Sequence, residues 1–375
     1  MTKDRLGYRE IGAYYEHLIR VGRLKPEQKL PTELELARTH GVTRTTIRRA
    51  FALLVRKGLV VKMQGRGTMV ASSVERDARL QSHVTVAPFE THAHGNLVSR
   101  VDDKRYRFGY TEAVVRTLQE YGRPFRLHYC TRDPEEVDRM TRELLRQGDI
   151  GLIMFDVHQE AILDRLLATP MPVVLLDSVT YGKDVDAVLG DDRAGTKEAT
   201  RYLLKTTPGR LVFFGGRSCR IPQSPQGQRL SGFREAHLEV GRDLREDQVQ
   251  ILPTGTPSAG NKAAREVLSW SWRPTGIICT DDSIAVGVLW ALQTSGLNVP
   301  ADISVIGFGD TLPLFATEPS LSTVAVDRAV MGRRTVELLE ERLKNPDGEK
   351  KVFTVPAELR LRQSTIPRDI APNGP

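Results

Sequence analysis

The chain has 375 residues, of which 40% are hydrophobic and 27% are charged, as is ordinary for a globular protein. No apolar run approaches the roughly 18 residues that a membrane span requires. The start Met1–Arg5 leads into a polar stretch without the apolar centre of a signal peptide. We therefore expect a cytoplasmic protein with no membrane partner.

The positive charge is concentrated at the start of the chain. Residues 1–70 hold 15 Lys and Arg against 6 Asp and Glu, whereas residues 71–375 hold 39 against 41. Such an asymmetry favours a polyanion, most simply a nucleic acid, as the partner of the basic segment. The alternative is a basic surface that serves only solubility.

The first segment predicts two helices separated by a turn. Residues 8–21 place apolar side chains at helical spacing. Thr32 and Glu35 have the spacing of a capping box, which opens a short helix that runs through Thr39. Gly41 is a typical residue to end it.

A third helix and a hairpin follow. Thr43 is the expected N-cap, and Gly58 closes the helix. The apolar face of this helix consists of Ile47, Ala50, Phe51 and Leu54. The apolar runs 59–61 and 68–70 flank the glycine-containing segment 64–67, which predicts a β-hairpin.

The remainder predicts an α/β fold. Residues 71–82 lack a period and are interpreted as a linker between a domain at 1–70 and a domain at 83–375. Short apolar runs (84–89, 150–155, 173–176, 211–214, 277–279, 303–308) alternate with helical patterns (193–205, 259–268, 282–295, 327–343). This alternation indicates parallel sheets covered by helices on both faces. The length favours two doubly wound subdomains with a ligand cleft between them.

The third helix carries the chemistry of DNA recognition. With its start at Thr43, residues Arg44, Thr45 and Thr46 lie outward beside free backbone N–H groups, and Arg48 follows one turn later. A helix N-terminus attracts phosphate. Arginines can bind guanine edges in the major groove, and threonines can contact phosphates or thymine methyl groups. The alternative for each arginine alone is a solvated helix face.

The hairpin supplies a candidate wing. Gly65 and Gly67 allow the backbone to approach DNA, and Arg66 between them can enter a narrow minor groove. The short helix, the turn, the basic helix and the wing together predict a winged helix-turn-helix that binds double-stranded operator DNA.

Residues 8–70 resemble the GntR family of winged helix-turn-helix domains. The motifs are Gly22-Arg23-Leu24-Lys25-Pro26, Lys29-Leu30-Pro31-Thr32-Glu33, Val42-Thr43-Arg44-Thr45-Thr46-Ile47-Arg48, Lys57-Gly58-Leu59-Val60 and Gly65-Arg66-Gly67-Thr68-Met69-Val70. The resemblance implies that Thr43, Arg44, Thr45, Thr46 and Arg48 face DNA together with the wing glycines. Glu27 departs from the glycine usual after the proline, and Leu34 replaces a DNA-contacting arginine of some members.

Residues 83–365 resemble the effector domain of the LacI/GalR family, which is built like periplasmic sugar-binding proteins. The main motifs are Met171-Pro172-Val173-Val174-Leu175-Leu176-Asp177, Val188-Leu189-Gly190-Asp191-Asp192, Gln228-Arg229-Leu230-Ser231-Gly232-Phe233, Thr280-Asp281-Asp282-Ser283 and Val299-Pro300-Ala301-Asp302-Ile303. The combination of head and body resembles arabinose-type regulators. It implies a homodimer that responds to a sugar or a sugar derivative.

Ligands of open α/β sheets bind beyond the carboxyl ends of the strands. Asp177, Asp281 and Asp310 each follow an apolar run, and Arg229 can bridge to them or to an anionic ligand. Asp177, Arg229 and Asp281 match ligand positions of the family. The alternative for each aspartate is a helix N-cap.

Three residues close to these candidates are not counted as ligand-binding residues. Asp282 is assigned to a helix N-cap and Asp191 to a structural turn. Gly309 occupies a position where the family commonly has a sugar-binding carboxylate, which favours an effector that does not need it. The alternatives are that Asp310 takes over this role or that the ligand has been lost. His92 and His94 are candidates to line the cleft.

No cofactor or metal site is expected. The loop histidines are more simply polar loop residues than ligands, and Cys130, Cys219 and Cys279 are too far apart for a metal or disulfide pattern. The predicted function is a ligand-responsive transcription regulator, a repressor of carbohydrate-related genes, rather than an enzyme. The alternatives are a transport-type binding protein, a pyridoxal-phosphate enzyme with an accessory head, and a regulator with a non-sugar effector.

Overall fold

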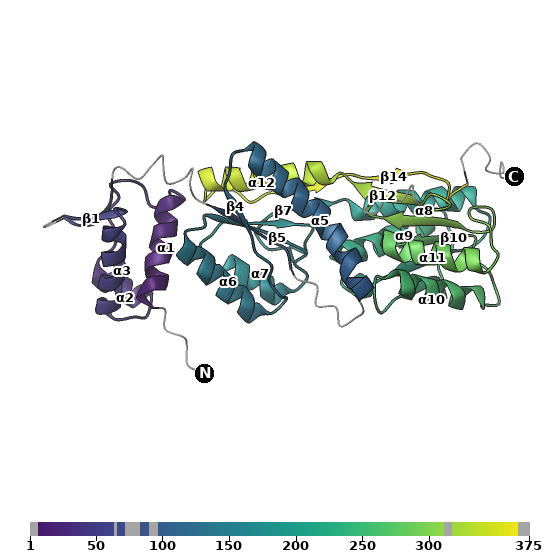
Figure 1. Cartoon of the computed structure of the whole chain (residues 1–375), viewed down its shortest axis with the longest axis horizontal. Coiled ribbons are helices and arrows are strands. Elements are labelled where there is room, and N and C mark those ends of the chain that lie inside the picture. Colours follow the sequence, from purple (N-terminus) through teal and green to yellow (C-terminus); the bar gives the residue numbers. More distant parts are fainter. Residues whose placement is uncertain (1–6, 64–65, 72–82, 90–96, 311–316, 367–375) are drawn as a thin grey trace.

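The structure is a computed structural model that describes residues 7–63, 66–71, 83–89, 97–310 and 317–366, with residues 97–108 described by their backbone alone. The molecule is elongated, with a small helical head at one end and two α/β subdomains in a row behind it (Figure 1). Within the described residues, no helix has the length and apolar character needed to cross a membrane.

The head has the predicted order of elements. It consists of α1 (Tyr8–Arg20), α2 (Glu33–Thr39), α3 (Arg44–Arg56) and an antiparallel hairpin of β1 (Val60–Met63) and β2 (Gly67–Val70). The capping box of Thr32 and Glu35 is present. The predicted face of α3 is confirmed as part of the head's core, which includes Ile11, Leu36, Ile47, Ala50, Phe51, Leu54 and Val60.

The first subdomain is a six-stranded sheet in the order β13-β7-β6-β5-β3-β4, with all pairs parallel. Its strands are β3 (Val84–Ala87), β4 (Phe125–Leu127), β5 (Gly151–Phe155), β6 (Val173–Leu176), β7 (Asp186–Gly190) and β13 (Val352–Val355). Its helices are α5 (Leu97–Glu120), α6 (Pro134–Gln147), α7 (Glu160–Leu167) and α12 (Arg328–Lys344). Although α12 and β13 come late in the sequence, they belong to this first subdomain.

The second subdomain is a six-stranded sheet in the order β14-β12-β11-β10-β8-β9. Its strands are β8 (Leu211–Gly215), β9 (Val249–Ile251), β10 (Gly276–Cys279), β11 (Ser304–Phe308), β12 (Ser322–Val326) and β14 (Ala357–Arg360). Its helices are α8 (Asp192–Thr206), α9 (Pro225–Glu239), α10 (Pro257–Leu268) and α11 (Asp282–Thr294), with short 3-10 turns at Arg217–Arg220 and Glu246–Gln248. The predicted fold class is confirmed. The antiparallel edge strand β14 was not predicted.

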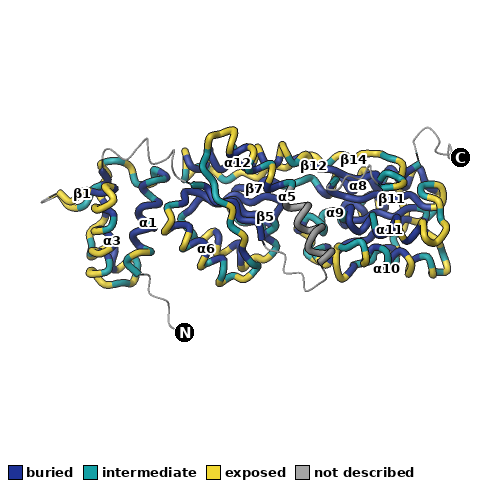
Figure 2. Tube along the Cα trace, viewed as in Figure 1, coloured by how far each residue is buried: buried dark blue, intermediate teal, exposed yellow. Residues whose placement is uncertain are grey.

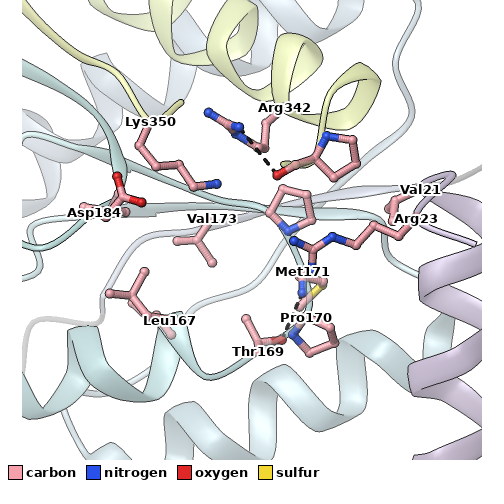
Figure 3. A pocket seen from close by; sticks show the side chains of 14 residues that line it. Val21, Arg23, Leu167, Thr169, Pro170, Met171, Val173, Asp184, Arg342 and Lys350 are labelled. Carbon is pink, nitrogen blue, oxygen red and sulfur yellow. Dashed lines mark hydrogen bonds between the residues drawn. The ribbon is translucent and has the colours of Figure 1, made fainter. Parts of the chain in front are cut away.

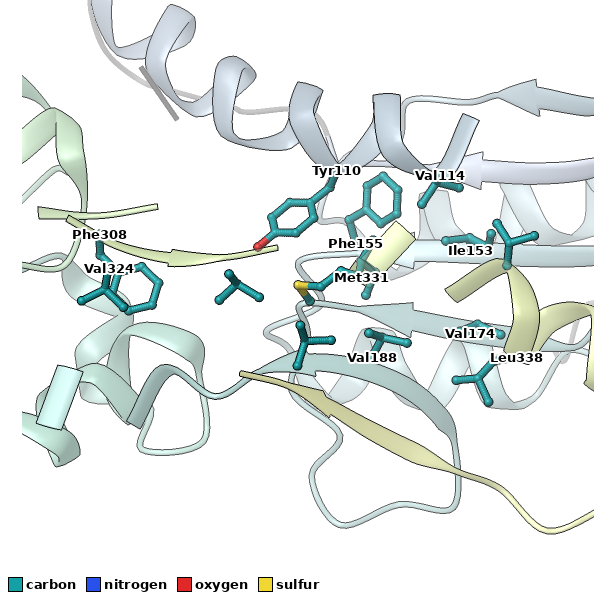
Figure 4. Packing of buried hydrophobic residues seen from close by; sticks show 14 of the residues in the cluster. Tyr110, Val114, Ile153, Phe155, Val174, Val188, Phe308, Val324, Met331 and Leu338 are labelled. Atoms are coloured by element: carbon teal, nitrogen blue, oxygen red, sulfur yellow. The ribbon is translucent and has the colours of Figure 1, made fainter. Parts of the chain in front are cut away.

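One hydrophobic cluster continues from the first sheet into the second. It runs from Val174 and Phe155 past Tyr110 and Met331 to Phe308 (Figure 4). The inner strands of both sheets are buried, while the outer faces of the covering helices are exposed (Figure 2). The helices that cover both faces of each sheet explain why the strands have continuous apolar runs.

The head rests on the first subdomain through α1, which packs against α6. His17 is 1% exposed in this contact. Its Nδ1 lies 3.1 Å from the carbonyl oxygen of Asp149, and its Nε2 lies 3.0 Å from that of Pro170. The helix α3 lies on the opposite side of α1 from the body (Figure 1). The helix predicted to face DNA is therefore turned away from the rest of the molecule.

Candidate DNA interface and ligand site

Thr43 is the N-cap residue that stabilises the N-terminus of α3. The Thr43 hydroxyl accepts a hydrogen bond from the Thr46 backbone N–H at 3.2 Å, as predicted. Arg44 and Thr45 are exposed, and Arg48 is exposed one turn further along. Two arginines and free backbone N–H groups thus share the outer face of the head. This arrangement can bind phosphate and base edges together.

The carboxylate of Glu33 in α2 forms ion pairs with the basic residues of this face. Its carboxylate lies 3.3 Å from Arg48 Nε, 3.3 Å from Lys62 Nζ and 3.9 Å from Arg44 Nη2. Although desolvation opposes the effect, the hydrogen bonds and charges of Lys62 and Arg48 hold the pKa of Glu33 below its ordinary value. Glu33 therefore stays ionised and holds Arg48 and Lys62 close to α2. The sequence patterns did not single out this residue.

The wing is described only in part. Arg66 is exposed, and its backbone N–H donates to the Met63 carbonyl at 3.1 Å. Gly67 has a φ of 97°, which favours glycine. Gly65 lies outside the described residues. The predicted DNA contacts of Arg66 and Gly67 remain predictions.

The carboxyl ends of the strands carry the predicted aspartates. Asp177 follows β6, Asp281 follows β10, and Asp310 comes two residues after β11. Asp177 and Asp310 both have a φ of 50°, a left-handed conformation that is strained for a residue with a side chain. Such strain is concentrated at functional sites.

Arg229 of α9 is 2% exposed and fixed from several sides. Its Nε donates to Asp192 Oδ1 at 2.6 Å, and its Nη1 donates to the Thr280 carbonyl at 2.7 Å. The guanidinium lies over the Phe308 ring, 3.6 Å from its centroid. Burial raises the pKa of Asp192, and the charge of Arg229 opposes this shift. Arg229 is thus a rigid cation at the ligand edge rather than a free one.

Asp281 lies beside this cation, with its Oδ1 3.8 Å from Arg229 Nη1. Its Oδ2 accepts hydrogen bonds from Gln226 at 3.0 Å and from the Thr280 hydroxyl at 2.7 Å. Desolvation raises the pKa of Asp281, and Arg229 lowers it in part. The structure therefore brings Asp281 and Arg229 together as the sequence predicted.

Asp310 has partners that the sequence did not predict. It accepts from Arg362 at 2.8 Å and also pairs with Arg360, both near the C-terminal strand. Although burial raises the pKa of Asp310, the two arginines hold it below its ordinary value. The neighbouring Gly309 has a φ of 121°. A side chain at Gly309 would be strained, so the backbone itself explains the absence of a second carboxylate there.

Two smaller predictions have clear outcomes. Asp191 is a structural residue, as predicted, because it caps α8 by accepting from the Ala194 N–H at 3.1 Å. The assignment of Asp282 to an N-cap was wrong. Asp281 occupies that position, and Asp282 lies buried in the first turn of α11, where it accepts from the Thr323 hydroxyl at 2.6 Å. His92 and His94 lie outside the described residues.

Asp156 was missed. It follows β5, has a φ of 59° and pairs with Arg132, whose guanidinium lies over Phe89. The Nε2 of His158 lies 3.0 Å from Asp156 Oδ1 but without hydrogen-bond geometry. The charge of Asp156 contributes to the raised pKa of Asp281, so the edges of the two sheets face each other here. Its place after an apolar run was the same signal that identified Asp177.

Two family models match separate parts of the chain. Residues 7–70 match the family model of bacterial regulatory proteins of the gntR family, and residues 202–365 match the periplasmic binding protein-like domain. The arabinose metabolism transcriptional repressor of Geobacillus stearothermophilus is 26% identical, with 92% of this chain and 93% of that protein covered. The HTH-type transcriptional repressor PurR of Vibrio vulnificus is 25% identical, with 89% and 98% covered. Among solved structures, a complex of the transcriptional regulator CelR with cellobiose is 22% identical, covers 89% of this chain and all of its own, and has a TM-score of 0.66.

Proposed function

The chain unites a GntR-type winged helix-turn-helix with a periplasmic-binding-protein-like domain of the LacI type, and from this premise we propose that it is a ligand-controlled repressor of carbohydrate-related genes. The observation that carries the proposal is the N-terminal part of α3, where Arg44 and Arg48 are exposed, on a helix that lies on the far side of α1 from the body (Figure 1). A regulator needs this arrangement, because DNA must reach the head without displacing the ligand domain.

We propose that DNA is bound by Thr43, Arg44, Thr45, Thr46 and Arg48 of α3, with Gly65, Arg66 and Gly67 at the wing. A single head contacts too few base pairs for specificity, so a homodimer with two heads on a two-fold operator is expected. The proposed domain division is 1–70 for the head, 71–82 for the linker and 83–375 for the body.

The proposed effector is a sugar or a sugar derivative that binds between the strand ends of the two sheets. Asp177 and Asp281 offer carboxylate acceptors for hydroxyl groups, and Arg229 offers a fixed cation. Asp156 and Arg132 extend the set on the first subdomain. The buried His158 Nε2, which has no hydrogen-bond partner among the residues that the structure describes, suits a ligand hydroxyl. Asp310 is a weaker candidate for contact with the ligand than the other aspartates, because Arg360 and Arg362 already pair with its two carboxylate oxygens.

In this proposal the protein acts in the cytoplasm, has no enzymatic activity and needs no cofactor. The effector controls binding by releasing the operator or by modulating the affinity for it. The similarity to transcriptional repressors over nearly the whole chain supports regulation rather than transport or catalysis.

The test begins with selection of bound fragments from genomic DNA, followed by a sugar panel in competition with the selected operator. We expect one sugar class to change operator affinity at least tenfold. Asp281→Asn should abolish that response while leaving operator binding in the absence of sugar unchanged. Asp243→Asn, an exposed carboxylate after α9, serves as the matched control. Failure to select any DNA would overturn the proposed function.

A further inference from the structure

A cavity of about 240 Å³ lies where the head meets the first subdomain. Val21 and Arg23 of the head form one wall, and the turn from Pro170 to Val173 forms another. The segment after α12 closes it with Lys350 (Figure 3). This cavity is separate from the strand ends proposed to bind the effector.

Arg342 lines the cavity but is fully committed to other groups. Its Nε and Nη2 bind the two oxygens of Asp186 at 2.7 and 3.0 Å, and Nη2 also donates to the Glu349 carbonyl at 2.7 Å. Asp186 and the Arg342 side chain are both buried. This pair neutralises itself and serves to hold the turn after α12 in place.

Lys350 is not satisfied in this way. Its ammonium lies 3.8 Å from Asp186 Oδ2, beyond hydrogen-bond distance, and within the described part of the chain it has no hydrogen-bond acceptor. Figure 3 shows its side chain directed into the cavity, with Arg23 extending toward the same space from the head. Burial lowers the pKa of Lys350 and the charge of Arg342 lowers it further, whereas the charges of Asp186 and Asp184 oppose the shift; Arg23 adds the smallest lowering.

The cavity therefore has an excess of positive charge. Once the self-neutralised pair of Arg342 and Asp186 is set aside, Lys350 and Arg23 remain beside a single carboxylate of the cavity lining, that of Asp184. Arg23 donates to Asp347 at 2.9 Å, but the Asp347 side chain is 83% exposed and its charge is screened by solvent. The Lys350 side chain is 26% exposed, and a partly buried lysine beside another cation is stabilised by an anion.

We propose that this junction cavity binds a small oxyanion, the phosphate or carboxylate group of a metabolite, between Lys350 and Arg23. The apolar side chains of Leu167, Met171 and Val173 line the rest of the space and suit a short carbon part of the same ligand. Arg23 belongs to the head and Lys350 to the body. A bound anion thus fastens the head to the first subdomain, independently of the proposed sugar effector.

The experiment is calorimetric titration of the full chain, without DNA or sugar. Sodium phosphate and sodium acetate are compared with sodium chloride at equal ionic strength. We expect the wild type to bind at least one oxyanion and Lys350→Met to bind it at least tenfold more weakly. Lys351→Met is the matched control, because the neighbouring ammonium pairs with Glu341 instead, and it should behave as the wild type.

The head can also attract anions at its DNA-binding face, so Arg48→Ala is titrated in parallel and should retain the binding. Loss in Arg48→Ala with retention in Lys350→Met would overturn the proposal. So would equal binding by the two lysine variants, or no binding of either oxyanion by the wild type. If Lys350→Met does not fold, Arg23→Gln on the head supplies the same comparison. None of these outcomes depends on the operator or on the effector.

Discussion

The contact between head and body should weaken as the pH falls, because His17 is buried in it. Burial is the largest cause that lowers the pKa of His17 to about 4, and the charge of Arg23 adds to it, while hydrogen bonds to the carbonyls of Asp149 and Pro170 oppose it. The ring is therefore neutral in the docked head. A neutral imidazole can donate to only one of those two carbonyls.

The sign and size of the effect follow from linkage. Since the pKa in the folded state lies below the ordinary 6.5, the stabilisation is fully present above pH 6.5 and is lost as the pH falls toward 4. With these two pKa values, about 2 kcal/mol is lost between pH 8 and pH 5, and about 3 kcal/mol by pH 4. Hydrogen exchange of the α1 amides, measured by mass spectrometry across this range, reports the opening of the contact.

Two variants make the measurement specific. His17→Leu should remove the extra pH dependence and cost roughly 1–3 kcal/mol at pH 8, because a buried carbonyl loses its donor. His128→Gln, at the end of β4, should keep the pH dependence of the wild type. Protection of α1 that increases on acidification would refute the reasoning, since it would mean that a charged ring donates to both carbonyls.

Three further substitutions test the proposed operator-binding helix, the backbone of the head and the proposed effector site. Arg48→Ala should weaken operator binding by roughly 1–3 kcal/mol and relax specificity at one base pair. Arg56→Ala, at the other end of α3, should have little effect on operator binding. Equal losses of affinity in the two variants, measured by anisotropy titration at fixed salt, would contradict the assignment. Glu27→Gly should stabilise the head by up to about 1 kcal/mol, because glycine relieves the left-handed strain but costs chain entropy. Glu27 has a φ of 63°, and a lower urea midpoint of the variant would argue against strain there. Arg229→Met should lower the free energy of unfolding by roughly 3–5 kcal/mol, because it leaves Asp192 buried without its partner. The same variant should also lose effector binding. An unchanged melting temperature would show that the ion pair is dispensable.

The head could be predicted almost completely because its signals are local. Thr32 and Glu35 are three residues apart, and Thr43 bonds to Thr46 within the same turn. Caps of this kind need no information from the rest of the chain. The hairpin was found for the same reason, since its two strands are neighbours in the sequence.

The body was predictable only where strands are buried on both sides. β6 has the predicted bounds, because its four residues are all buried and apolar. β13 was missed, since Val352 and Phe353 are exposed at the edge of the sheet and form no continuous apolar run with their neighbours. The partners of Asp310 could not be predicted either, because Arg360 and Arg362 lie 50 and 52 residues away in the sequence.

The two ends of β5 suggest how an effector can reach the head. The Asp149 carbonyl, just before this strand, contacts His17, whereas Asp156, just after it, lies at the candidate ligand edge. The strand is buried throughout and paired on both sides with β3 and β6. A close-packed strand of this kind does not deform locally. If the subdomains close on the proposed effector, we expect the first subdomain and its docked head to move as one body. Control of the operator then depends on the spacing of two heads in the proposed dimer. His17→Leu should accordingly keep effector affinity but weaken the effect of the effector on operator binding, and full coupling in this variant would contradict the rigid-body account.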